Sequence, residues 1–126
     1  MNKDLELVLA AERKRYAVLY ELWKVAKDST QQTLNIQELV KGGIIQEDDV
    51  IPVLCYLRDE GLVKDSNLWI NFTHKGIVEI ERSIKHPERE TEHFSATVIQ
   101  HFHAPVGIVQ TGSGSTGNIV DDSSAS

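Results

Sequence analysis

The chain has 126 residues, of which 40% are hydrophobic and 25% charged, which fits a soluble globular protein with one domain and an appendage. No apolar run approaches the length of a membrane span, and no signal-peptide core follows the first residues, so we expect a cytoplasmic protein. The single cysteine, Cys55, excludes an internal disulfide and a cysteine-based zinc site.

The net charge of −6 is shared equally by two regions. Residues 1–90 hold all thirteen Lys and Arg residues against sixteen Asp and Glu residues, which leaves −3. Residues 91–126 add another −3, because Glu92, Asp121 and Asp122 are opposed by no base. A DNA-binding protein usually needs a basic patch, since phosphate neutralisation and counterion release supply most of its affinity. DNA binding by this acidic chain would therefore depend on a local cluster of bases.

Residues 5–27 predict a helix, because apolar side chains recur at spacings of three and four. One apolar stripe holds Tyr16, Leu19, Trp23 and Ala26, and an adjoining stripe holds Val18, Leu22 and Val25. So wide an apolar face is typical of a helix that is buried on more than one side. The first residues either continue this helix or form an arm that leads into it. A protruding arm would be suited to packing on a second copy, whereas the simpler interpretation is a core helix.

A polar loop over residues 28–32 leads to a short strand at residues 33–34. Asn35 then predicts the N-cap of a second helix, with Glu38 three residues later completing a pair that resembles a capping box. This helix is expected to end at Gly42 or Gly43. Ile44 and Ile45, which follow, are expected to pack in the core between the second and third helices.

The acids Glu47, Asp48 and Asp49 open a third helix, where carboxylates suit the positive end of the helix dipole. Pro52 fits its first turn, because an N–H at that position has no intrahelical acceptor to lose. Gly61 is expected to end the helix in a left-handed conformation. The predicted buried face comprises Val50, Leu54 and Leu57, with Ile51 and Val53 beside them.

Residues 62–64 and 68–72 predict a hairpin around a turn at residues 65–67, which would form a minimal wing. Thr73 is placed to cap a further helix, which ends before Pro87. The apolar stripe of that helix is Ile77, Ile80 and Ile84.

The last third of the chain predicts strands rather than helices. Residues 94–103 alternate apolar and polar side chains, residues 106–111 predict a second strand, and residues 117–120 a third. From residue 121 onward the chain is polar. On the first of these strands, one side would carry Phe94, Ala96, Val98 and Phe102.

The region from residue 13 to residue 85 resembles the winged helix-turn-helix superfamily. The segments that carry the resemblance are Leu57-Arg58-Asp59-Glu60-Gly61-Leu62-Val63 and Trp69-Ile70-Asn71-Phe72-Thr73-His74-Lys75-Gly76. The resemblance implies an α+β fold with three to four helices and a short wing hairpin, within a domain over residues 1–90. Residues 91–126 would form a C-terminal β-strand extension that ends in a polar tail. DNA binding is the default function that the resemblance implies, but a fold alone does not establish it.

The residues of the predicted recognition helix do not favour DNA. The end that would enter the major groove carries Glu47, Asp48 and Asp49, and carboxylates are repelled by phosphates. The helix has one base, Arg58, and the wing offers Lys64. A compensating cluster lies on the first helix, at Arg13, Lys14 and Arg15 with Lys24 and Lys27, and we interpret it first as a solvated basic face.

We therefore predict a non-enzymatic binding or regulatory module that needs no cofactor and binds a protein partner. Its partner surface would comprise Glu47, Asp48, Asp49, Arg58 and Trp69, although Trp69 could equally cover the hairpin from the core side. The alternative is a DNA-binding transcriptional regulator that uses Arg13, Lys14, Arg15 and Lys64.

The apolar strands of the tail predict self-association, because isolated strands of this kind need a partner edge. The residues expected at this homo-oligomer interface are Phe94, Val98, Phe102, Val106, Ile108 and Gln110. The segment Gln110-Thr111-Gly112, with the Gly and Ser residues after it, also resembles the C-terminal motifs of bacterial amyloid-signalling proteins. That resemblance implies a third function, a fibre-forming signalling adaptor.

Histidines give the one hint of chemistry. His101 and His103 would share one face of a strand, with His93 nearby, and two imidazoles at that spacing can share a metal ion. Such residues are more often ordinary polar strand residues, so we predict no metal site. No nucleophile arrangement, phosphate loop or paired carboxylate is evident in the sequence, which argues against an enzyme.

Overall fold

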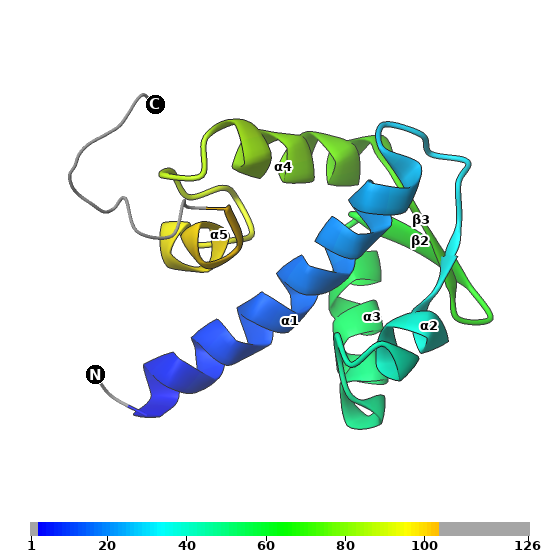
Figure 1. Cartoon of the computed structure of the whole chain (residues 1–126), viewed down its shortest axis with the longest axis horizontal. Helices are drawn as coiled ribbons and strands as arrows, with labels where there is room; N and C mark the ends of the chain where they lie inside the picture. Colours follow the sequence, from blue (N-terminus) through cyan, green and yellow to red (C-terminus); the bar gives the residue numbers. More distant parts are fainter. Residues whose placement is uncertain (1–2, 104–126) are drawn as a thin grey trace.

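The computed structural model describes residues 3–103 as an α+β domain built around one long helix (Figure 1). Its elements are α1 (Lys3–Ala26), β1 (Leu34–Asn35), α2 (Ile36–Lys41), η1 (Glu47–Asp49), α3 (Val50–Asp59), β2 (Val63–Ser66), β3 (Trp69–Phe72), α4 (His74–Lys85) and α5 (Ala96–His103). Figure 1 shows α1 in the middle of the molecule, with α4 and α5 on one side and α3 on the other. This order is compatible with the winged-helix architecture expected from the sequence. Among the described residues, no helix is both long and apolar enough to cross a membrane.

Helix α1 is one continuous helix of 24 residues, so the first residues continue it. Its buried positions are Tyr16, Val18, Leu19, Leu22 and Ala26, whereas Val25 is 47% exposed. Because α3, α4 and α5 all contact α1, its buried face is wide, as the two apolar stripes predict.

The three strands form an antiparallel sheet in the order β1-β3-β2. Ile70 is the central partner, opposite Leu34 of β1 and Asp65 of β2. The hairpin turn lies one step later than the sequence predicts, because Ser66 pairs with Trp69 and leaves Asn67 and Leu68 as the two turn residues. Both have positive φ, 50° and 72°, as tight hairpin turns of this twist require.

Polar caps and glycines define the ends of the helices, largely as predicted. Asn35 Oδ1 accepts from the Gln37 N–H at 2.9 Å, which satisfies a free donor at the start of α2. At the start of α4, Thr73 Oγ1 accepts a hydrogen bond from the Gly76 N–H at 3.0 Å. The same hydroxyl donates to the carbonyl of Gly61. Gly43 and Gly61 have φ values of 79° and 77°, which favour glycine after α2 and α3.

Two isoleucines that the sequence assigned to the core lie at the surface instead. Ile51 is 64% exposed, because the inward face of α3 is already formed by Val50 and by residues three and four positions later in the helix. Ile44 is 37% exposed, while its neighbour Ile45 enters the core at 3%.

The strand predicted over residues 94–103 is wrong: Ala96–His103 form the helix α5. Phe94, Val98 and Phe102 are spaced by four residues, which suits one face of a helix as well as one face of a strand. Packing on α1 and α4 selects the helix, and Ser95 Oγ accepts from the Val98 N–H at its start. Phe94, Val98 and Ile99 lie in the same core cluster as α1 and α4, so residues 91–103 share the core of the residues before position 90.

The Tyr16 hydroxyl joins α1, α4 and α5 inside the core. Ser83 Oγ donates to the carbonyl of Ile80 at 2.6 Å, so it accepts from the Tyr16 hydroxyl, also at 2.6 Å. The Tyr16 oxygen in turn accepts from His103 Nε2 at 2.5 Å. With one proton on each hydroxyl, this direction satisfies all three contacts. Burial raises the pKa of Tyr16 to about 12.

We expect Gly76→Ala to destabilise the domain. A Cβ at Gly76 would lie 2.0 Å from the carbonyl oxygen of Leu62, which is backbone and cannot swing away. The loss in the free energy of unfolding should be about 2 kcal/mol or more, in spite of the better helix propensity of alanine. Urea denaturation measures it. Gly42→Ala is the matched control, because a Cβ there would lie 3.4 Å from its nearest neighbour. Equal stability of the two variants would contradict the prediction.

Tyr16→Phe should lower the free energy of unfolding by about 1–3 kcal/mol, because Ser83 and His103 each lose a buried hydrogen-bond partner. In the wild type, stability should fall between pH 10 and 12, since the unfolded chain ionises Tyr16 near 10 and the folded chain near 12. Urea denaturation across this range should show a shallower fall for Tyr16→Phe. Equal slopes for the wild type and Tyr16→Phe would contradict the prediction.

Candidate functional site

Large apolar and charged side chains are exposed on the outer face of α3 and on the adjoining wing. Ile51 projects from α3 with 64% of its surface exposed, and Trp69 projects from β3 with 49% exposed. Trp69 is therefore a surface residue and not a core cover for the hairpin. Other exposed side chains are Pro52, Arg58 and Asp59 on α3, Lys64 and Ser66 on β2, and Glu47 and Asp48 on η1, which precedes α3.

Asp49 and Lys14 neutralise each other, although the sequence placed them in two different candidate sites. Lys14 Nζ lies 2.9 Å from Asp49 Oδ1, and the other carboxylate oxygen accepts from the Gln46 N–H at 3.0 Å. The Gln46 hydrogen bond and then the Lys14 ammonium hold the pKa of Asp49 below its usual range. Only 17% of the Asp49 side chain is exposed, so this acid points toward α1 while Glu47 and Asp48 face outward.

The remaining candidate bases of α1 are held in different environments. The Arg15 guanidinium lies over the ring of Tyr56, 3.8 Å from its centroid, and so packs against α3. Lys24 lies 2.8 Å from Glu21, and Lys27 lies over the ring of Trp23 at 4.6 Å. Arg13 borders a shallow hollow between α1 and α5.

Arg58 connects α3 to the wing. Its guanidinium lies 3.4 Å from Asp59 Oδ1 and 3.9 Å from Asp65 Oδ2 on β2. The positive charge of Arg58 is thus shared between two carboxylates, and Lys64 is the exposed base that the wing adds.

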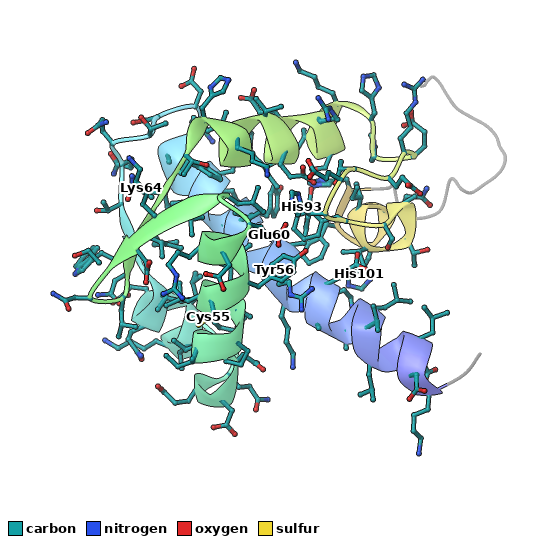
Figure 2. The ribbon with its side chains drawn as sticks, turned by 180° about the vertical axis from the view of Figure 1, so that it is seen from behind. Cys55, Tyr56, Glu60, Lys64, His93 and His101 are labelled. Carbon is teal, nitrogen blue, oxygen red and sulfur yellow. The ribbon has the colours of Figure 1, made fainter. Side chains whose placement is uncertain are left out.

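The histidine pair expected at residues 101 and 103 does not form. On a helix, two residues two positions apart point to different sides. His103 turns inward to Tyr16, and burial lowers its pKa, whereas His101 is exposed (Figure 2).

The third histidine, His93, lies near carboxylates from three parts of the chain. Figure 2 shows it close to one of them, Glu60. Its Nε2 lies 3.0 Å from Glu60 Oε1 at the end of α3 and 4.0 Å from Glu92 Oε2. Its Nδ1 lies 3.2 Å from Glu79 Oε1 on α4. The side chains of His93 and Glu79 are only 3% and 4% exposed.

Sequence reasoning noticed His93 but missed its partners. Glu79 lies on the buried face of α4, whose other buried members are Gly76, Ile77, Ile80 and Ser83. The signal available in the sequence was the position of Glu79, directly before Ile80 of the apolar stripe, which indicates a buried carboxylate. Glu60 precedes His93 by 33 residues, so no spacing rule joins the two.

Comparison with known proteins gave no match: no family model fits the chain, and neither the curated proteins nor the solved structures contain a significant relative. The geometry of the described residues therefore has to support any function assigned to this chain.

Proposed function

We propose that this chain is a non-enzymatic winged-helix module that binds a protein partner through the outer face of α3 and the wing. The helix-strand-helix-helix-hairpin-helix order of α1 to α4 supports the winged-helix assignment. The observation that carries the partner proposal is the exposure of Ile51 and Trp69, two large apolar side chains on the elements that winged helices present to their targets.

The charges around these apolar residues favour a basic protein surface over DNA. Glu47 and Asp48 are exposed at the start of α3, where DNA phosphates would approach. Two of the bases that could offset them are engaged within the chain: Lys14 with Asp49, and Arg58 with Asp59 and Asp65. A partner with a positive rim around an apolar centre would complement this surface.

A photo-crosslinking amino acid at position 51 of the full chain, expressed in its own cells, tests the proposal. We expect a discrete protein adduct, because a side chain here would lie at the centre of the interface. The matched control is the same amino acid at Val78, a 38% exposed apolar position on α4, which should give no such adduct. Trp69→Ala should weaken the adduct from position 51.

Nucleic-acid binding is measured in parallel with a random DNA duplex at low salt. Salt-dependent binding that is lost in Arg13→Ala and Lys64→Ala, together with no protein adduct at position 51, would replace the proposal with the DNA-binding regulator.

We also propose that self-association resides beyond His103. Phe94 and Val98, which were expected at the interface, are 1% and 0% exposed within their own chain, and Phe102 packs beside Tyr16 and Tyr20. They are satisfied without a second copy. Val106, Ile108 and Gln110 lie outside the described residues, so the apolar residues Val106, Ile108 and Val109 in the sequence are the support for this part.

A chain that ends after His103 should be a monomer by light scattering, whereas the full chain should have the mass of an oligomer. This truncation retains α5 and the Tyr16 contacts, so its thermal unfolding should match that of the full chain. An equal mass for the two chains would remove the tail from self-association.

A further inference from the structure

The imidazole of His93 is buried in a setting dominated by negative charge. Three carboxylates, those of Glu60, Glu79 and Glu92, lie within 4.0 Å of its ring nitrogens. Nearby, Glu12 accepts from the Ser95 N–H at 2.8 Å. One guanidinium, that of Arg15, lies over the ring of Tyr56. The ring of Tyr56 in turn forms a T-shaped contact with the ring of His93. The cluster is therefore short of positive charge.

The hydrogen bonds around His93 determine where its proton lies. Nε2 is 3.0 Å from Glu60 Oε1, and a carboxylate can only accept, so Nε2 carries the proton and donates. In the neutral imidazole, Nδ1 then holds a lone pair. Nδ1 is buried and makes no hydrogen bond, although Glu79 Oε1 is 3.2 Å away. In that neutral form two electron-rich atoms face each other, and a second proton or a metal cation between them would satisfy both.

We propose that Glu79, Glu92 and His93 form a binding site for a divalent transition-metal ion of the zinc class. One ligand atom from each of the three residues lies within 4.8 Å of the others. Imidazole nitrogen and carboxylate oxygen are both zinc ligands, at about 2.0–2.2 Å. In a tetrahedral site with such bonds, neighbouring ligand atoms are about 3.3 Å apart, close to the distance between Nδ1 and Glu79 Oε1.

The site is preorganised except for one ligand. Glu79 Oε2 accepts from Thr91 Oγ1 and from the His93 N–H, which leaves Oε1 directed at the imidazole. Glu60 holds the outer nitrogen of His93, as carboxylates commonly do for metal-bound histidines. Glu92 Oε2 lies 4.0 Å from the outer nitrogen Nε2, so this side chain, which is 66% exposed, has to turn toward Nδ1 to close the site.

There is also space beside the three residues for a fourth ligand of the metal ion. Residues 90–95 and Glu12 line a hollow of about 210 Å³ beside His93, large enough for water as a fourth ligand. The ion would link α4 to the connection that leads into α5. It would thus stabilise the domain and is independent of the partner surface on α3.

The test uses the full chain after removal of metals with a chelator. Zn²⁺ is titrated by calorimetry, and Co²⁺ is titrated by its visible absorption, which reports tetrahedral coordination. We expect one ion per chain and a higher unfolding temperature with Zn²⁺. Glu92→Gln should weaken binding at least tenfold without unfolding the apo chain, because Glu92 is exposed. His93→Gln should abolish the Co²⁺ spectrum.

Glu90→Gln is the matched control, because Glu90 lines the same hollow but is outside the ligand group. It should bind Zn²⁺ like the wild type, as should His101→Ala, which removes an exposed histidine. The proposal is overturned if the wild type binds neither ion at a single site. It is also overturned if Glu92→Gln and Glu90→Gln weaken binding equally, since the acids would then attract ions without a defined site.

Discussion

Tyr16 lies where α1, α4 and α5 meet, and a polar atom buried at this point has to find its partners there. Ser83 on α4 and His103 on α5 supply them, so the hydroxyl fixes the relative positions of three helices. The ring of Tyr16 also packs edge-on against Phe94, which anchors the start of α5. Because α1 passes from this junction to α3, the position of the outer face of α3 depends on the same residue.

The charge distribution follows from how α1 is buried. Where α1 packs against other helices, its bases contact neighbouring elements, as Lys14 does with Asp49 and Arg15 with Tyr56. Long cationic side chains can cover apolar or aromatic surface while their charge is balanced locally. Two bases of the run Arg13-Lys14-Arg15 thus contact neighbouring elements. The exposed surface of α3 and η1 carries acidic and apolar side chains.

The order of elements from α1 to α4 could be predicted because each has a local signal: a stripe with a helical period, Asn35 and Thr73 as caps, and Gly61 as a stop. The α5 segment had an ambiguous pattern, and contacts with α1 more than 80 residues away decided its form. Of the residues expected on a partner surface, Glu47, Asp48 and Trp69 are exposed, while Asp49 is paired with Lys14. The cluster around His93 could not be predicted, because its members come from α3, α4 and a loop that only the tertiary fold brings together.

The bond between Tyr16 and His103 also bears on how the chain folds during synthesis. The two residues are 87 positions apart, so the tyrosine leaves the ribosome long before its histidine is made. Until α5 emerges, the aromatic face of α1 that Phe94 and Phe102 will cover stays open to solvent. Contacts this distant in sequence form late, and exposed apolar surface attracts chaperones and other nascent chains. A slow stretch of translation just before α5 would lengthen that exposure, so codon choice there should affect the yield of folded protein.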